Sequence, residues 1–215
     1  MTRPSSVQRR DEILDAAFAL FRTKGLLQTS TRDLTEVMGI SRSHIYHYFP
    51  NWQALCLAAL DKYMTADLQQ VDDLLHGLPP ALALLTLADS IMPYEMDGEW
   101  LLYADTWQAS ARIEAYRELA QKVNDGWNGL IAATINQGSE AGIFAPVDAG
   151  QVARQLSAMI NGYADVLALD PSRDTRQQAL LDIVAFMNVS LKPTQPLDAS
   201  LLDKLTPQTD GPSCE

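Results

Sequence analysis

The chain has 215 residues, with 16 lysines and arginines against 27 aspartates and glutamates, and a formal net charge of −11. Its hydrophobic fraction of 47% is ordinary for a folded protein and excludes a disordered chain, and no stretch approaches the ~18 consecutive apolar residues of a membrane span. The first apolar segment holds Asp11, Glu12 and Asp15 and is not typical of a secretory signal. Because Cys56 and Cys214 lie far apart and form no disulfide framework, we expect a cytoplasmic protein.

The charge is unevenly distributed along the chain. Residues 1–55 carry seven basic and five acidic side chains, whereas the remaining 160 residues carry nine and 22. Binding to phosphates depends on lysine and arginine, so the acidic average alone would argue against a nucleic-acid partner. The distribution instead allows the N-terminal part to approach DNA while the rest of the chain is repelled by it.

Helical periodicity dominates the whole sequence, and no convincing alternating strand occurs, which predicts an all-α fold. A first helix of about 20 residues is predicted to end at Lys24, before Gly25. Ser30 and Ser41 are typical helix N-caps, so two short helices are predicted on either side of Gly39. The first predicted helix starts after Ser5 or Ser6, and the following ones cover residues 31–38 and 42–48 and about 51–76, 81–92, 97–107, 109–142, 149–168 and 173–191.

Two short helices joined by a glycine-containing turn, after one longer helix, are typical of a helix-turn-helix. We therefore expect a three-helix DNA-binding domain over 1–52, followed by a larger helical domain over 53–192. From residue 193 the sequence is rich in Pro, Thr, Gln, Asp and Ser, which predicts a largely disordered tail over 193–215, with at most one helical turn at 198–205.

Residues 29–51 (TSTRDLTEVMGISRSHIYHYFPN) carry the most specific pattern in the sequence. Their apolar members can pack the two short helices on the first one, and these are Leu34, Val37, Met38, Ile40, Ile45 and Phe49. The second short helix then has polar and aromatic side chains with few duties in the core: Arg42, Ser43, His44, Tyr46, His47 and Tyr48. A recognition helix needs this division, since its outer face must supply donors to a major groove or to phosphates.

At these residues the sequence resembles the TetR family of transcriptional regulators. The similarity covers residues 10–60 and includes ILDAAFALF before Lys24-Gly25 and TSTRDLTEVMGISRSHIYHYF after them. The resemblance implies that Thr31 and Arg32 begin a helix beside the DNA backbone, and that Tyr46 and His47 contact phosphates. Family members often carry a lysine soon after the Phe, whereas this chain has Asn51-Trp52-Gln53 there.

Other interpretations of this segment stay open. Tyr48, and less readily Tyr46, could be buried core aromatics, and the segment could be a helical hairpin with no DNA role. His44 and His47 could bind a metal, but His76 is the only other histidine, so no metal site is predicted. The sequence contains no phosphate-binding glycine loop, zinc-protease motif or nucleophile elbow, so neither an enzyme nor a cofactor is expected.

The resemblance also implies that the last two long helices, at about 149–168 and 173–191, form a homodimer. The apolar side chains that could build this interface are Val152, Leu156, Met159, Ile160, Tyr163, Val166 and Leu167, followed by Leu180, Leu181, Ile183, Val184, Phe186 and Met187. A palindromic operator also requires two recognition helices. The alternative is that these residues pack within one chain.

Aromatic and acidic side chains on one helical face suggest a ligand site. The candidates are Asp97, Trp100, Tyr103 and Trp107, with Glu99 close by and with Tyr116, Trp127 and Asn128 on the following helix. Aromatic faces beside a carboxylate suit an organic cation. WLLYADTW and NGYADVLAL also resemble the C-terminal domain of the choline-responsive, BetI-like branch. Core packing and a neutral or aromatic ligand remain alternatives.

The resemblance therefore implies a homodimeric, ligand-responsive repressor that binds a double-stranded DNA operator and a small-molecule effector. The hypothesis for its mechanism is that the effector shifts the long helix at 51–76 and changes the separation of the two recognition helices. The alternative is a helical protein-interaction module that no longer binds DNA.

Overall fold

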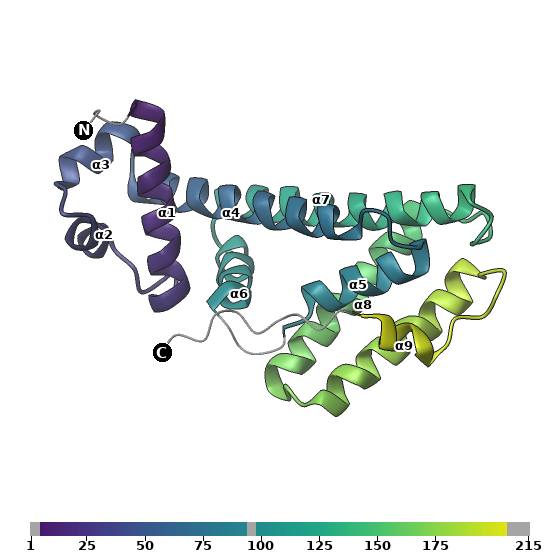
Figure 1. Ribbon diagram of the computed structural model, residues 1–215. Helices are drawn as coiled ribbons and strands as arrows, with labels where there is room; N and C mark the ends of the chain where they lie inside the picture. The colour runs from purple at the N-terminus through teal and green to yellow at the C-terminus, as the bar shows by residue number, and fades with distance from the viewer. Residues whose placement is uncertain (1–4, 94–97, 206–215) are drawn as a thin grey trace. The chain divides into compact units, whose positions relative to one another are not determined.

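The computed structural model describes residues 5–93 and 98–205, and within them the chain is helical with no strand (Figure 1). The helices are α1 Ser6–Lys24, α2 Thr31–Met38, α3 Arg42–Tyr48, α4 Trp52–Leu75, α5 Pro80–Ile91, α6 Gly98–Ser110, α7 Glu114–Glu140, α8 Ala149–Leu169, α9 Arg173–Leu191 and the short 3₁₀ helix η1 Ala199–Lys204. The all-α prediction is confirmed. The predicted break after residue 107 falls later, because α6 continues to Ser110.

The chain forms two compact units. The first contains residues 1–70 and 95–126, and the second contains residues 71–94 and 127–215. The helix-turn-helix thus shares its unit with α6 and with the first parts of α4 and α7, rather than standing alone.

The short helices begin and end where the local sequence signals place them. Ser30 accepts a hydrogen bond from the Asp33 amide, while the Asp33 carboxylate accepts one from the Ser30 amide at 2.8 Å, which makes a capping box. Ser41 caps α3 in the same way by accepting from the His44 amide at 3.2 Å. Gly39 ends α2 at φ +62°, a left-handed conformation that a residue without Cβ adopts at little cost.

In the first unit, apolar residues of α1 to α4 form one core. Ile13, Phe21, Leu34, Ile45 and Leu60 are all at most 1% exposed. Helix α6 packs on α1 so closely that a Cβ on Gly98 would lie 2.0 Å from the Arg22 carbonyl oxygen. The carboxylate of Asp105 also accepts a hydrogen bond from the Leu26 amide at 3.1 Å, so α6 is fixed at two points to the end of α1.

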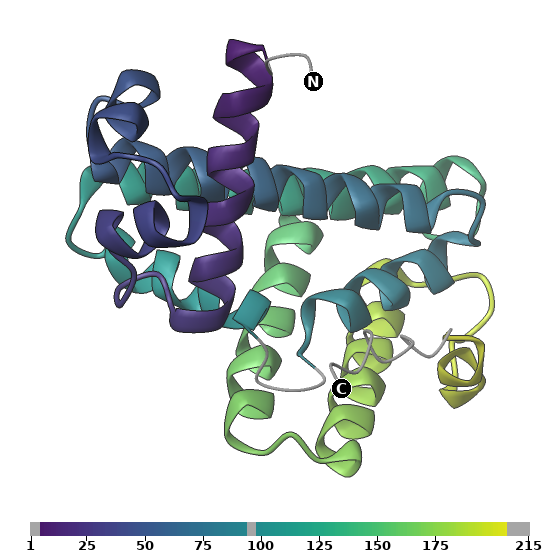
Figure 2. The same ribbon diagram turned by 60° about the vertical axis from the view of Figure 1, so that its left-hand side comes forward.

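The second unit is built on the antiparallel pair α8 and α9, against which α5 packs (Figures 1 and 2). Its buried core draws leucines from α5 and apolar residues from α7, α8 and α9. Within this core Arg176 of α9 donates to Asp89 of α5 from both Nε (3.1 Å) and Nη2 (2.7 Å). The same guanidinium donates to the carbonyl oxygens of Asp89, Met92 and Pro93, so it holds the C-terminal end of α5.

Most side chains that the sequence assigned to a dimer interface pack inside the second unit instead. The buried ones are Val152, Leu156, Ile160, Leu167, Leu180, Ile183, Val184 and Met187, while Met159, Tyr163 and Phe186 are half-buried against the same core. The assignment of the buried side chains to the interface was wrong, because the periodicity of a helix marks a buried face without indicating which chain buries it. Of the remaining two members, Val166 is 45% exposed and faces outward, and Leu181 is half-buried.

The segment expected to be disordered from residue 193 is ordered as far as it is described. Asn188 accepts from the Leu197 amide and donates to its carbonyl, both at 2.8 Å, and η1 follows. Leu197, Leu201 and Leu205 pack on the core of the second unit. The apolar residues within a polar composition account for this difference. Residues 206–215 lie outside the described part of the chain.

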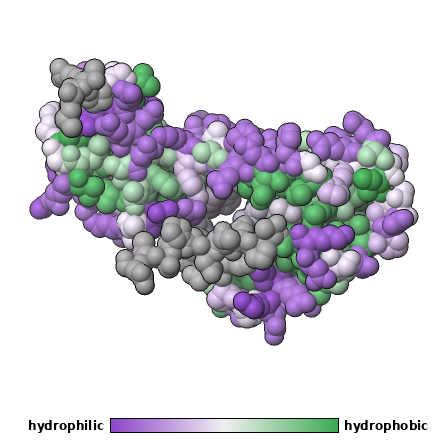
Figure 3. All heavy atoms as spheres, viewed as in Figure 1, coloured by the Kyte–Doolittle hydropathy of each residue, from purple (hydrophilic) through white to green (hydrophobic). Residues whose placement is uncertain are grey.

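No helix in the described ranges is both long and apolar enough to cross a membrane. The space-filling view shows hydrophilic and hydrophobic residues intermixed on the visible face of each unit (Figure 3).

Candidate nucleic-acid interface and ligand site

Helix α3 divides its side chains between the core and the surface as the sequence predicts. Ile45 is fully buried, and Phe49, directly after the helix, is 2% exposed. The predicted DNA-contacting residues fall into two groups: Arg42, Ser43, Tyr46 and His47 are exposed, and His44 and Tyr48 are half-buried. Tyr48 contacts the rings of His44 and His47 at centroid distances of 5.6 and 5.0 Å. These rings pack along one side of α3, and the exposed donors of the helix remain accessible.

The N-terminus of α2 meets α3 through two hydroxyl groups. Thr31 Oγ1 and Tyr46 Oη lie 3.2 Å apart, so the start of α2, predicted to lie beside the DNA backbone, is next to Tyr46, one of the two predicted phosphate contacts. Arg32 is exposed beside them and pairs with Glu36 at 2.7 Å. Arg42 forms no ion pair with any described residue, so its guanidinium is available to an external partner.

Two arginines of α1 contact residues of α3 and the residue that follows it. Arg9 donates from Nε to His44 Nε2 at 3.5 Å and pairs with Glu12 at 2.7 Å. The guanidinium of Arg10 lies 5.0 Å from the centre of the Phe49 ring, a cation–π distance. Below α2, the Lys24 ammonium and the Ser30 cap hold the pKa of the Asp33 carboxyl well below its usual value.

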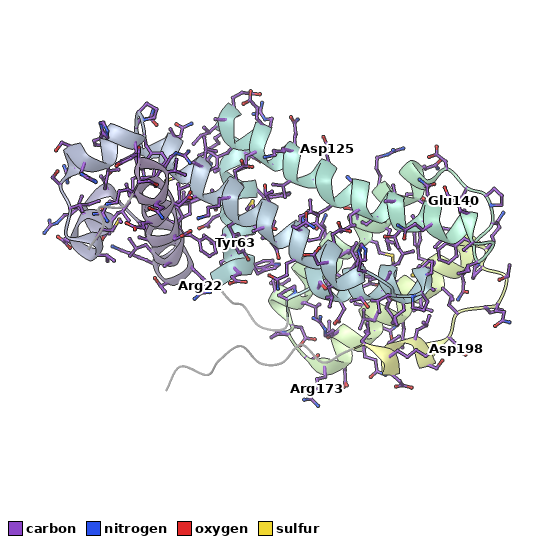
Figure 4. The ribbon with its side chains drawn as sticks, turned by 45° about the horizontal axis from the view of Figure 1, so that its top comes forward. Arg22, Tyr63, Asp125, Glu140, Arg173 and Asp198 are labelled. Atoms are coloured by element: carbon purple, nitrogen blue, oxygen red, sulfur yellow. The ribbon has the colours of Figure 1, made fainter. Side chains whose placement is uncertain are left out.

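A second cluster of side chains lies in the same unit, where α1, α4 and α6 meet. We call Phe18, Tyr63, Tyr103 and Trp107 the aromatic cluster. The rings of Phe18 and Tyr63 stack at 4.2 Å, Tyr63 contacts Tyr103 at 6.4 Å, and Tyr103 contacts Trp107 at 5.9 Å. Figure 4 shows Tyr63 of α4 and Arg22 of α1 near each other at this junction.

Two carboxylates are bonded to the tyrosines of this cluster. Tyr103 donates from its hydroxyl to Asp67 Oδ2 at 2.7 Å, and Tyr63 donates to Glu99 Oε2 at 3.0 Å. Glu99 is also paired with Arg22 at 3.0 Å, whereas no cation pairs with Asp67 in the described ranges. Burial raises the pKa of Asp67, the Tyr103 hydroxyl lowers it in part, and the charge of Glu99 raises it further.

Only some of the predicted ligand residues come together. Tyr103 and Trp107 do, and Trp100 is half-buried on the same helix. Asp97 lies outside the described residues. Tyr116 is buried against Cys56, and burial raises the pKa of the Cys56 thiol to about 12 and that of the Tyr116 hydroxyl as well.

The remaining predicted residue, Trp127, belongs to the second unit and packs on its core. Its neighbour Asn128 has a buried Oδ1 with no hydrogen-bond donor among the described residues. Sequence reasoning missed Phe18, Tyr63 and Asp67. The spacing of Tyr63 and Asp67, four residues apart on α4, is the one signal that could have linked a ring to a carboxylate there.

Neither cluster is arranged for metal binding. No group of three or more His, Cys, Asp or Glu side chains in the described ranges could hold a metal ion. The surface of α2 and α3 can present hydrogen-bond donors to an anionic polymer. The aromatic cluster can place rings and a carboxylate around a positive charge.

Comparison with known proteins finds two family models that match this chain. The model for bacterial regulatory proteins of the tetR family matches residues 13–59, and the model for the C-terminal part of BetI-type transcriptional repressors matches residues 80–188. The chain belongs to the TetR family. This TetR-family protein is therefore a transcriptional regulator rather than an enzyme, and its N-terminal match contains the entire α2–α3 surface.

Individual relatives agree with this assignment. An uncharacterised helix-turn-helix regulator of Bacillus subtilis, YfiR, is 28% identical over 68% of this chain and 73% of its own length. The regulator EthR of Mycobacterium tuberculosis is also 28% identical, over 73% of this chain and 69% of its own. A solved transcriptional regulator from Saccharomonospora viridis in complex with choline shares the fold, with a TM-score of 0.72 and 23% identity over 85% of this chain and 97% of its own.

Proposed function

We propose that this TetR-family regulator is a homodimeric repressor that leaves its operator when a small organic cation binds. The observation that carries the DNA-binding part is the surface of α2 and α3, where Arg42, Tyr46 and His47 are exposed above a buried Ile45. That surface supplies groove and phosphate donors, while the rigid core beneath it fixes their spacing.

The proposed effector site is the aromatic cluster with its two carboxylates. Rings of Tyr63, Tyr103 and Trp107 offer cation–π attraction, and Asp67 and Glu99 supply negative charge in a partly dry setting. The BetI-type match over residues 80–188 and the choline complex of the S. viridis protein support this class of ligand. The competing interpretation, an aromatic core without a ligand, predicts no binding of choline.

The location of the cluster suggests how binding reaches DNA. Phe18 and Arg22 come from α1 of the helix-turn-helix, and they contact Tyr63 of α4 and Glu99 of α6. A ligand that separates these rings changes the position in which α1 packs on α4 and α6. It releases the operator only to the extent that it prefers the non-binding state, by about 5.5 kcal/mol for a complete switch.

The homodimer is proposed to use the outward faces of α8 and α9. On α8 these faces carry Ala158, Gly162, Val166 and Leu169, and on α9 they carry Ala185 and Val189, all exposed in the single chain. Leu169 and Val189 are 89% and 75% exposed, so this face offers apolar area that a second copy of the chain could bury.

The experiment that tests this function is selection of bound duplexes from a random pool, followed by titration of the selected site. The proposal expects a palindromic site whose half-sites lie about one helical turn, or a multiple of it, apart. Choline should then lower the affinity for that site. If the pool yields no preferred sequence, the chain is the helical interaction module instead, and if choline leaves affinity unchanged the effector assignment is wrong.

A further inference from the structure

Of the two carboxylates bonded to the aromatic cluster, Asp67 has no cationic partner among the residues that the structure describes. Glu99 already pairs with Arg22, whereas the hydroxyl of Tyr103 is the only polar contact found for Asp67 in the described part of the chain. Asp67 is half-buried on α4, one turn from Tyr63, and its bonded partner Tyr103 touches Trp107. A carboxylate held this way has lost part of its hydration and has no ion pair in return.

We propose that Asp67 is the specificity-determining counter-charge for the cationic effector, and that the effector competes with a proton for it. This inference rests on the proposed effector site. It goes further by assigning the negative charge to α4, whereas the sequence had placed it on Asp97, and by making effector affinity depend on pH.

The surroundings of Asp67 explain the competition. From α6 it faces Tyr103 and the charge of Glu99, from α4 it lies near Tyr63, and α1 contributes Arg22, which is occupied by Glu99. Both burial and the negative Glu99 favour the neutral acid, so the pKa of Asp67 is raised in the free protein. An organic cation reverses this preference because it stabilises the ionised form.

Binding of the cation is linked to the equilibrium between the protonated and ionised forms of Asp67. At a pH below the raised pKa of Asp67, the carboxyl must release one proton to solvent when a cation binds. The affinity for the cation therefore falls up to about tenfold for each unit by which the pH is lowered. Above that pKa the carboxylate is already ionised, so affinity no longer depends on pH. A neutral ligand of the same shape binds without releasing a proton.

The test uses calorimetric titrations of the full chain with choline, tetramethylammonium and 3,3-dimethylbutan-1-ol (dimethylbutanol below). The last compound is the uncharged isostere of choline, with carbon in place of the quaternary nitrogen. Wild-type protein should prefer choline over dimethylbutanol on the order of tenfold to a hundredfold. Asp67→Asn should abolish this preference and the pH dependence, while Asp67→Glu should keep both. Titrations in two buffers of different ionisation enthalpy should show proton release by wild type at acidic pH and none by Asp67→Asn.

Asp61→Asn is the matched control, because Asp61 lies on the same helix and pairs with Lys122 at 2.5 Å. It should bind choline like wild type. If Asp67→Asn retains the preference and the pH slope, the assignment of Asp67 is wrong and the proposed effector site stands. If neither cation binds wild type at any pH, both the effector proposal and this inference are wrong. Thermal melting of each variant separates loss of binding from loss of fold.

Discussion

At the scale of single residues, the proposed DNA-binding surface of α2 and α3 offers two kinds of group to DNA. Tyr46 and Thr31 place hydroxyls 3.2 Å apart beside the α2 N-terminus, where a phosphate would be held in any sequence. Arg42 stands at the first turn of α3 with no ion pair among the residues described, and a free guanidinium there can reach a base edge.

Substitutions should therefore act differently at the two positions. Tyr46→Phe removes a hydroxyl donor to phosphate and should weaken binding about tenfold for every sequence. Arg42→Ala should cost about 1–3 kcal/mol at the selected site and also relax the preference for one base pair. Fluorescence anisotropy on the selected operator and on single-base variants measures both effects. Tyr163→Phe, which removes a hydroxyl in the other unit, is the control. Unchanged affinity in Tyr46→Phe would contradict the phosphate assignment.

The carboxyls of Asp67 and Asp33 should change the free energy of unfolding in opposite directions as pH rises. Burial raises the folded-state pKa of Asp67, so its ionisation destabilises the fold as pH rises through the unfolded and then the folded pKa. The Lys24 ammonium and Ser30 lower the pKa of Asp33, so its contribution is present at neutral pH and disappears as pH falls.

Chemical denaturation at several pH values checks these signs. Without ligand, Asp67→Asn should be more stable than wild type at neutral pH, and the difference should vanish in acid. Asp33→Asn should be less stable than wild type at neutral pH and equal to it in acid. If Asp67→Asn were instead destabilised at neutral pH by the same amount as in acid, the carboxylate would not be desolvated in the free protein.

Local signals explain why the elements of this fold could be predicted from sequence and the ligand site could not. Ser30, Gly39 and Ser41 decide helix ends within four residues of themselves, so the bounds of α2 and α3 are as predicted. Tyr103 and Trp107 also lie on one helix, and their contact followed from spacing. Phe18 and Asp67 join the same cluster from α1 and α4, and no periodicity within one helix reveals such a meeting.

Helices α5 and α9 of the second unit are joined by a buried ion pair. Arg176 is 9% exposed and Asp89 is 4% exposed, and the guanidinium also bonds three carbonyl oxygens at the end of α5. Removing one member of such a pair leaves the other charge buried and unpaired, which costs about 3–5 kcal/mol. The pair thus fixes where α5 ends against α9.

Arg176→Met should accordingly lower the free energy of unfolding by about 3–5 kcal/mol, which is on the order of 10 °C in melting temperature for a chain of this size. Arg173→Met, at the exposed start of the same helix, is the control and should change stability little. The double variant Arg176→Met with Asp89→Leu should recover part of the loss, because no buried charge remains. A loss of less than about 1 kcal/mol in the single variant would mean that the pair is hydrated.

At the scale of the whole molecule, the low positive charge of the N-terminal segment makes the proposed dimer important for DNA binding. Residues 1–55 carry a charge of only +2 within a chain of −11. One such segment makes few phosphate contacts, so a monomer should bind weakly and with a shallow salt dependence. Two copies held at a fixed separation make the second contact intramolecular, which raises affinity without any added charge.

Placing aspartates at Val166 and Leu169 should therefore break the dimer and DNA binding together. These side chains are 45% and 89% exposed on α8, so Val166→Asp with Leu169→Asp costs a single chain little, yet it buries two charges in the proposed interface. Sedimentation equilibrium should show a monomer, and operator affinity should fall on the order of a hundredfold or more. Leu74→Asp, at a 51% exposed leucine of α4, should remain dimeric. A double variant that stays dimeric would place the interface elsewhere, whereas a monomer with unchanged affinity would show that one recognition helix suffices.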